Sequence, residues 1–220
     1  MRRGKTWFFG LLQPAGLCEA LRHHPLRLAG CAGPGWCILE LITGAQTARI
    51  DACGRQQMAE EPEESKRKAL ELFYRAYEHQ LRGKLQEAIR SYQLSIAAHP
   101  TAEAHTFLGW SYALQRRHDE AIAECHRAIA IDPEFGNPYN DIGAYLIELG
   151  RLGEAIPWLE KATRAPRYES PCFPHYNLGR VWEKKGLWPK ALQAYEAALC
   201  CNADYALAQR SILRLRARLN

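Results

Sequence analysis

Residues 101–134 have the sequence TAEAHTFLGWSYALQRRHDEAIAECHRAIAIDPE, and this stretch decides the fold. Its small residues, Gly109, Ala121 and Ala128, are interspersed with larger apolar ones, a pattern typical of two antiparallel helices that approach each other closely. Asp132 and Pro133 then predict the end of the second helix, because the residue before a proline is disfavoured in helical backbone. The stretch is therefore expected to form a helix, a turn and a second helix.

The small residues recur along the chain at nearly constant spacing. The intervals are 33, 34 and 36 residues between Ala88, Ala121, Ala155 and Ala191. Twelve residues before these alanines stand Ala76, Gly109, Gly143 and Gly179, and seven residues after them stand Ser95, Ala128, Ala162 and Ala198. A single helix pair cannot bury its own apolar face, so a pattern that occurs four times predicts a stack of helix pairs.

These positions resemble the signature of the tetratricopeptide-repeat family, in which an aromatic residue, Leu-Gly, Tyr, Ala, Phe and Pro follow at fixed offsets. The second unit matches at Leu108, Gly109, Tyr112, Ala121, Ala128 and Pro133, with Cys125 in place of the usual aromatic residue. The third matches at Tyr139, Gly143, Gly150, Ala155, Leu159 and Ala162, and the fourth at Leu178, Gly179, Trp182, Gly186, Ala191, Tyr195 and Ala198. The first diverges most and keeps Gly83, Ala88, Tyr92 and Pro100. The resemblance implies an all-α fold, a right-handed superhelical solenoid of about four tetratricopeptide helix pairs plus a C-terminal capping helix.

The repeats set the expected domain organisation. We expect an irregular N-terminal extension at 1–57, a charged lead-in at 58–68, four repeats at about 69–101, 102–135, 136–171 and 172–203, and a capping helix at 204–220. Met58 is a plausible start of translation, which leaves open whether residues 1–57 are expressed. The segment Leu28–Cys31 resembles a lipoprotein cleavage box, which leaves open an attachment to the cell envelope.

Glycine predicts where the first helix of a pair ends. Gly83, Gly150 and Gly186 stand at this point, and glycine adopts the left-handed backbone conformation of a helix C-terminus at little cost.

The longest interval predicts an insertion within Ala165–His175, which contains three prolines. This segment is either a tolerated loop insertion or a rigid lip beside the binding groove. Tyr168, Cys172 and Phe173 are expected to be exposed on it.

Composition and charge argue against several classes of protein. The formal net charge is +5, but residues 1–57 hold seven Lys and Arg against three Asp and Glu, which leaves 22 against 21 in the remainder. A nearly neutral body argues against a nucleic-acid partner, which would need a clustered basic face. No segment approaches the ~20 apolar residues of a membrane span.

No cofactor or metal is expected. The six residues Cys18, His23, His24, Cys31, Cys37 and Cys53 could in principle supply zinc ligands, but their spacing matches no common site. The spread of the eight cysteines suits reduced thiols, so we expect a cytoplasmic protein.

The family resemblance implies a concave groove lined by the first helix of each unit. The groove positions carried over onto this chain are Phe73, Tyr74, Tyr77, Thr106, Phe107, Trp110, Asn140, Asp141, Ala144, Tyr176, Asn177 and Arg180. This lining is aromatic at one end and rich in amides at the other, which suits a peptide segment of a partner protein. About a third of the aromatic residues are expected only to pack against the neighbouring unit, and Glu124 is expected on the convex surface.

The residues predict a scaffold or adaptor for protein-protein interaction that is not an enzyme, since no nucleophile and base, phosphate loop or ligand cluster occurs at motif spacing. Two alternatives remain open, a non-catalytic targeting or assembly factor attached to the cell envelope and an RNA-binding helical repeat, which would need a basic groove. The C-terminal tails of chaperones are disfavoured partners, because no basic cradle forms at the clamp positions. These positions hold Phe73, Tyr77, Phe107, Asn137 and Asp141 in one register and Thr106, Trp110, Asp141, Phe173 and Asn177 in the other.

Overall fold

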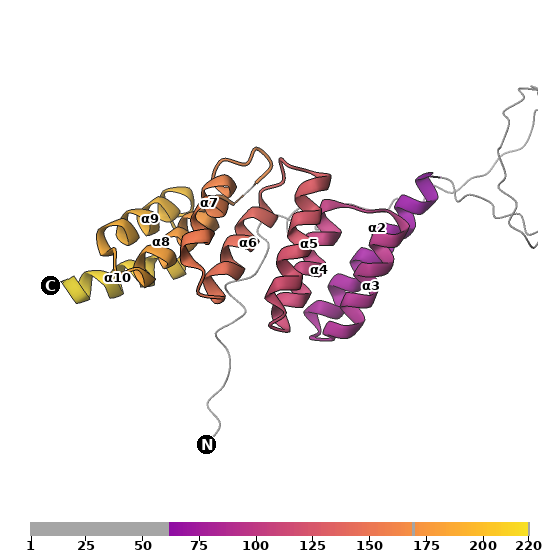
Figure 1. The fold of residues 1–220 in the computed structure, drawn as a ribbon, viewed down its shortest axis with the longest axis horizontal. Helices are drawn as coiled ribbons and strands as arrows, with labels where there is room; N and C mark the ends of the chain where they lie inside the picture. Colours follow the sequence, from indigo (N-terminus) through magenta and orange to yellow (C-terminus); the bar gives the residue numbers. More distant parts are fainter. Residues whose placement is uncertain (1–61, 169, 220) are drawn as a thin grey trace, which may run out of the picture.

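The computed structural model describes residues 62–168 and 170–219, and these residues form a row of α-helices (Figure 1). The nine helices in these ranges are α2 (Pro62–Leu81), α3 (Leu85–Ala98), α4 (Ala102–Leu114), α5 (His118–Ile131), α6 (Asn137–Glu148), α7 (Leu152–Ala162), α8 (Cys172–Lys184), α9 (Trp188–Cys201) and α10 (Ala206–Leu219). They pack as the pairs α2–α3, α4–α5, α6–α7 and α8–α9, and α10 packs on α9. The chain is therefore an all-α repeat solenoid, as the sequence predicts. The extension at 1–57 lies outside the described residues.

The first helix begins earlier than the repeat pattern predicts. Helix α2 starts at Pro62, so residues 62–68 of the charged lead-in are helical. Proline is well tolerated at the first helical position, and Glu63 and Glu64 in the first turn interact favourably with the helix dipole. Residues 62–68 are thus the first part of the first repeat helix.

The glycines of the repeat lie where the two helices of a pair almost touch. A Cβ atom added at Gly143 would lie 2.4 Å from Cδ2 of Leu159, and one at Gly179 would lie 2.4 Å from the ring of Tyr195. These contacts confirm that the small residues allow the helices of a pair to pack closely.

Left-handed turns end the first helices, as predicted at Gly83, Gly150 and Gly186, whose φ angles are 73°, 76° and 73°. The second pair turns in the same way at Arg116, with a φ of 66°. A side chain in this conformation costs about 1 to 2 kcal/mol, so the arginine is tolerated in spite of local strain.

Helix α10 closes the C-terminal end of the stack. Its residues Ala208, Ile212 and Leu215 are buried in a core shared with α8 and α9. The arginines on its other faces remain in solvent, where Arg216 pairs with Glu196. This distribution is that of a capping helix, with one apolar face on the last repeat and a polar outer surface.

The lengthened connection between α7 and α8 is attached to the connection between α5 and α6. The backbone N–H of Gly136 donates to the carbonyl oxygen of Arg167 at 3.0 Å, and the N–H of Arg167 donates to that of Glu134 at 3.1 Å. These two bonds form an isolated bridge between two segments about one repeat apart. The insertion is therefore held by the neighbouring connection along this part of its length.

The side chain of Arg167 strengthens this attachment. Its guanidinium lies 2.8 Å from Glu103 at the start of α4, 2.6 Å from Asp132 at the end of α5, and over the ring of Phe135. The expectation that Tyr168, Cys172 and Phe173 are exposed is wrong. Cys172 is the first residue of α8 and is buried in the core that α8 shares with α9 and α10, and Tyr168 and Phe173 are half-buried.

Candidate peptide-binding face

The predicted site residues lie on the first helices of the four pairs. These helices contact one another in the order α2, α4, α6 and α8. We call their shared surface the first-helix face, and define it by two sets of equivalent positions one helical turn apart. The first set, which is buried, is Phe73, Thr106, Asn140 and Tyr176. The second set is Tyr77, Trp110, Ala144 and Arg180, of which all but Ala144 are partly exposed.

Aromatic rings gather at the α2 end of this face. The ring of Phe107 lies 5.1 Å from that of Phe73, 5.6 Å from that of Tyr77 and 5.9 Å from that of Trp110, all in edge-to-face geometry. Phe107 itself is only 2% exposed, so it packs between the first and second pairs. Such a cluster fixes the orientation of the more accessible Tyr77 and Trp110.

An apolar cavity of about 320 Å³ opens beside this cluster, between α2, the end of α3 and the start of α4. Phe73 and Tyr74 line it together with Leu70, which the sequence analysis did not select. Leu70 and Tyr74 are 53% and 42% exposed, so both side chains are accessible to a partner. The cavity can accept one apolar side chain of a partner.

Trp110 carries a polar atom with an unused bonding capacity. Its indole Nε1 is buried and has no acceptor in the described part of the chain. A buried donor without an acceptor costs about 1 to 3 kcal/mol, so this N–H destabilises the packing of Trp110.

Amides and one arginine form a chain of hydrogen bonds at the α6–α8 end. Asn177 donates from Nδ2 to Oδ1 of Asn140 at 2.9 Å, and Arg180 donates to Oδ1 of Asn177 at 3.0 Å. Arg180 also pairs with Glu148 at 2.7 Å. The chain links two successive repeats and holds these side chains in one arrangement. Asn177 is thus mainly a positioning residue, buried beneath Arg180.

Asp141 lies close to this chain of bonds but has a poor hydrogen-bond environment. Burial raises the pKa of its carboxyl to about 7, and a bond from Nδ2 of Asn140 at 3.3 Å only partly offsets this effect. Burial, and then the charge of Asp141, also raise the pKa values of Cys125 and Tyr145. The carboxyl therefore titrates near neutral pH within the interface between the second and third pairs.

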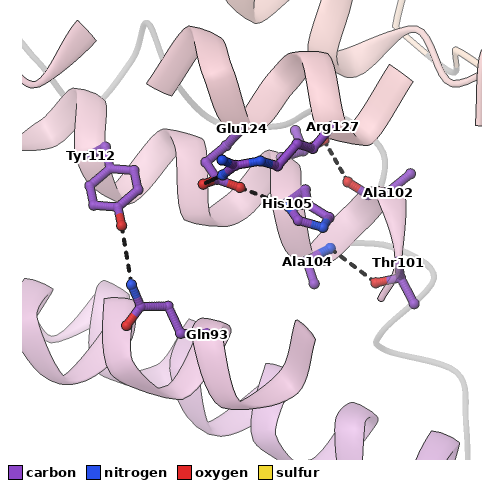
Figure 2. Close-up of polar contacts among 9 residues, drawn as sticks. Gln93, Thr101, Ala102, Ala104, His105, Tyr112, Glu124 and Arg127 are labelled. Atoms are coloured by element: carbon purple, nitrogen blue, oxygen red, sulfur yellow. Dashed lines mark hydrogen bonds and ion pairs between the residues drawn. The ribbon is translucent and has the colours of Figure 1, made fainter. Parts of the chain in front are cut away.

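A second polar cluster lies between α4 and α5, and it includes Glu124, which was predicted on the convex surface. Figure 2 shows His105 and Glu124 facing each other, with Nδ1 and Oε2 2.7 Å apart. Glu124 also accepts from Arg127 and is only 6% exposed, so the expected convex position is wrong. A signal was present, because Ala121, Glu124, Cys125 and Ala128 occupy one helical stripe, the buried stripe of α5.

Two features were not found among the described residues, a cluster of metal ligands and a membrane-spanning helix. No three of their His, Cys, Asp and Glu side chains meet as metal ligands, and the cysteines and histidines proposed from 1–57 lie outside them. Within the same ranges, no helix has the length and apolarity required to cross a bilayer.

Sequence comparison identifies the repeat in two places. A family model described as tetratricopeptide repeat matches residues 75–134, and another with the same description matches residues 137–167. The chain is also 28% identical over 158 residues to an Arabidopsis thaliana protein described as inactive TPR repeat-containing thioredoxin TTL3. The match covers 66% of this chain and 21% of that protein, so the chain spans about a fifth of the length of this curated relative.

Solved structures share the fold at low sequence identity. PilF of Pseudomonas aeruginosa is 22% identical with a TM-score of 0.61, and the match covers 71% of each chain. YrrB, described as a TPR protein with an unusual peptide-binding site, is 19% identical with a TM-score of 0.54, over 65% of this chain and 73% of its own. The arrangement of helix pairs is therefore found in proteins of clearly different sequence.

Proposed function

Because this chain belongs to the tetratricopeptide-repeat family, we propose that it is a protein-interaction scaffold that binds a peptide segment of a partner on the first-helix face. The family is generally a non-catalytic interaction module. The peptide-binding site named for YrrB supports the assignment, since the two proteins share the fold.

The observation that carries this proposal is the ordered arrangement of unlike side chains along one face. An apolar cavity and aromatic rings at the α2 end are followed by the Asn140–Asn177–Arg180 chain at the α8 end. The side chains are already held in place by their neighbours, so binding a peptide costs little further conformational entropy. The buried amides of Asn140 and Asn177 hold Arg180 in position, and the cavity suits an apolar anchor.

Catalysis and the other partner classes are less well supported. The residues of the first-helix face include no nucleophile with an adjacent base, which is why we propose a binding role without turnover. RNA is disfavoured because Arg180 is the one cation among the positions that define the first-helix face, whereas a polyanion needs a clustered basic surface. The exposed thiols of Cys200 and Cys201 favour a reducing compartment, and we propose the cytoplasm.

The proposal can be tested with a displayed library of random 12-residue peptides selected on the full-length protein. The affinity of a selected peptide is then measured by fluorescence anisotropy for the wild type and for two matched variants. Leu70 in the cavity and Leu94 on α3 are exposed to the same degree, 53% and 55%. We expect Leu70→Ala to weaken binding at least fivefold and Leu94→Ala to change it less than twofold. Equal effects of the two variants, or a library without binders, would overturn the proposal.

A further inference from the structure

A cavity of about 460 Å³ between α8, α9 and α10 is lined by an unusual concentration of cations. Arg180 and Lys184 lie one turn apart on α8, and Arg214 and Arg218 lie one turn apart on α10. The capping helix thus adds two arginines to the end of the first-helix face. Side chains of equal charge repel each other, so the arrangement requires compensation by anions.

Carboxylates of the described residues form ion pairs with two of these four cations. Arg214 pairs with both carboxylate oxygens of Glu183 at 2.9 and 2.8 Å, and Tyr195 donates to the same carboxylate at 2.7 Å. Arg180 pairs with Glu148. These carboxylates are therefore occupied and do not repel a ligand as free anions would.

The other two cations have no carboxylate partner among residues 62–168 and 170–219. Lys184 forms no ion pair there, and Arg218 lies with its guanidinium 5.0 Å above the ring of Trp188. The stacked ring holds the guanidinium in place and leaves its N–H groups available. The cavity therefore carries an excess of about two positive charges.

We propose that this cavity binds acidic side chains of the partner peptide, whose apolar anchor occupies the cavity at the α2 end. This inference rests on the proposed function and deepens it, because it assigns both a charge and a direction to the peptide. An excess of two charges matches two or three carboxylates. It is too small for a nucleic-acid strand, whose many phosphates would extend along the first-helix face, where Arg180 is the one cation among the positions that define it.

The spacing of the helices sets the length of the peptide. Adjacent packed helices lie about 8 to 10 Å apart, so the three steps from α2 to α8 span roughly 24 to 30 Å. The cationic cavity also lies about two helical turns further along its helix than the apolar cavity does, which adds roughly 12 Å along the helix axis. An extended chain advances about 3.3 Å per residue, so the anchor and the acidic residues are separated by about nine residues.

The test uses three fluorescein-labelled peptides of 12 residues and the full-length protein, with anisotropy measured at 50 and 300 mM salt. All three carry Leu-Trp near one end, and the other end holds three Glu, three Gln or three Lys. We expect the Glu peptide to bind at least tenfold more tightly than the Gln peptide at 50 mM salt, and this ratio to fall at 300 mM. The Lys peptide should bind most weakly.

Two double variants with the same change in net charge identify the site. Lys184→Gln with Arg218→Gln should abolish the preference for Glu over Gln. Lys185→Gln with Arg210→Gln should preserve it, because these exposed cations lie outside the cavity, directly after α8 and on α10. Loss of the preference in both variants would show a general charge effect and overturn the assignment.

The remaining outcomes separate this inference from the proposed function. If the Glu and Gln peptides bind equally and Leu70→Ala weakens both, the acidic site is refuted while peptide binding stands. If none of the three peptides binds, and the library also yields no binder, both proposals fail. If poly(U) RNA binds more tightly than the Glu peptide, the cavity belongs to a nucleic-acid surface and the peptide assignment is overturned.

Discussion

Replacing Gly179 by alanine tests the packing on which every repeat depends. The new Cβ atom would lie 2.4 Å from two carbon atoms of the Tyr195 ring. Carbon atoms in contact are normally about 3.5 Å apart, so the ring or the helix must move by about 1 Å. The ring cannot move freely, because Tyr195 is fully buried and its hydroxyl is bound to Glu183.

The expected cost follows from three contributions. Overpacking a well-filled core costs about 1 to 3 kcal/mol, and a strained Tyr195–Glu183 bond adds about 1 kcal/mol. Alanine is a better helix former than glycine by about 1 kcal/mol, which offsets part of this cost. We therefore expect Gly179→Ala to lower the free energy of unfolding by about 1 to 3 kcal/mol.

Urea denaturation followed by circular dichroism at 222 nm measures this effect, and Gly153→Ala is the matched control. Gly153 also lies in a helix, α7, but an added Cβ atom there meets no atom within 4 Å. The control should be unchanged or more stable, by up to about 1 kcal/mol. If Gly179→Ala is as stable as Gly153→Ala, close helix packing does not explain the glycine of the repeat.

Three further changes test other parts of the structure. Asp141→Asn should be at least about 1 kcal/mol more stable than the wild type at pH 8. The pKa of Asp141 is about 7 in the folded protein and 3.8 ordinarily, so the wild type loses stability as the pH rises between these two values. The full pKa shift corresponds to ~4 kcal/mol, and the expected effect is smaller because Asp141 is partly exposed. This difference should disappear below about pH 4, and a constant difference across urea titrations from pH 4 to 8 would contradict the assignment. Glu124→Ala should lower the free energy of unfolding by about 2 to 4 kcal/mol, because it leaves His105 buried without its partner. A change below ~0.5 kcal/mol in urea or thermal unfolding would show that Glu124 lies on the convex surface after all. Arg167→Ala should lower the free energy of unfolding by about 1 kcal/mol and should accelerate trypsin cleavage at Arg164. An unchanged cleavage rate would show that the attachment of the α7–α8 connection does not depend on the Arg167 side chain.

The number and order of the helices were predictable because the repeat fixes them locally. The small residue at Gly143 and the left-handed glycine at Gly150 each act on the adjacent helix or turn, so their spacing alone indicates the helix pair. Arg116 was not predictable as a turn of the same kind, because an arginine gives no signal for positive φ. The early start of α2 was missed since residues 62–68 carry charges in place of the small residues of the repeat.

The candidate site was predictable in position but not in its interactions. Equivalent spacing places Trp110 and Arg180 on one face, whereas the bond between Asn140 and Asn177 depends on the relative placement of two repeats. Glu124 was predicted on the convex surface because it is charged, although its spacing places it in the buried stripe of α5. The contribution of Arg218 could not be foreseen, because it depends on how the last helix packs on α9.

The attachment of the α7–α8 connection changes how far a local disturbance can spread through the stack. In a linear array each repeat contacts only its neighbours, so units can open one at a time. Arg167 joins the boundary of the third and fourth units to Glu103 in the second, and Gly136 is bonded across the same gap. Opening of the third unit alone would break these bonds, which couples its stability to that of the second. The second and third units are thus expected to exchange their amide protons as one cooperative unit, with closely similar opening free energies.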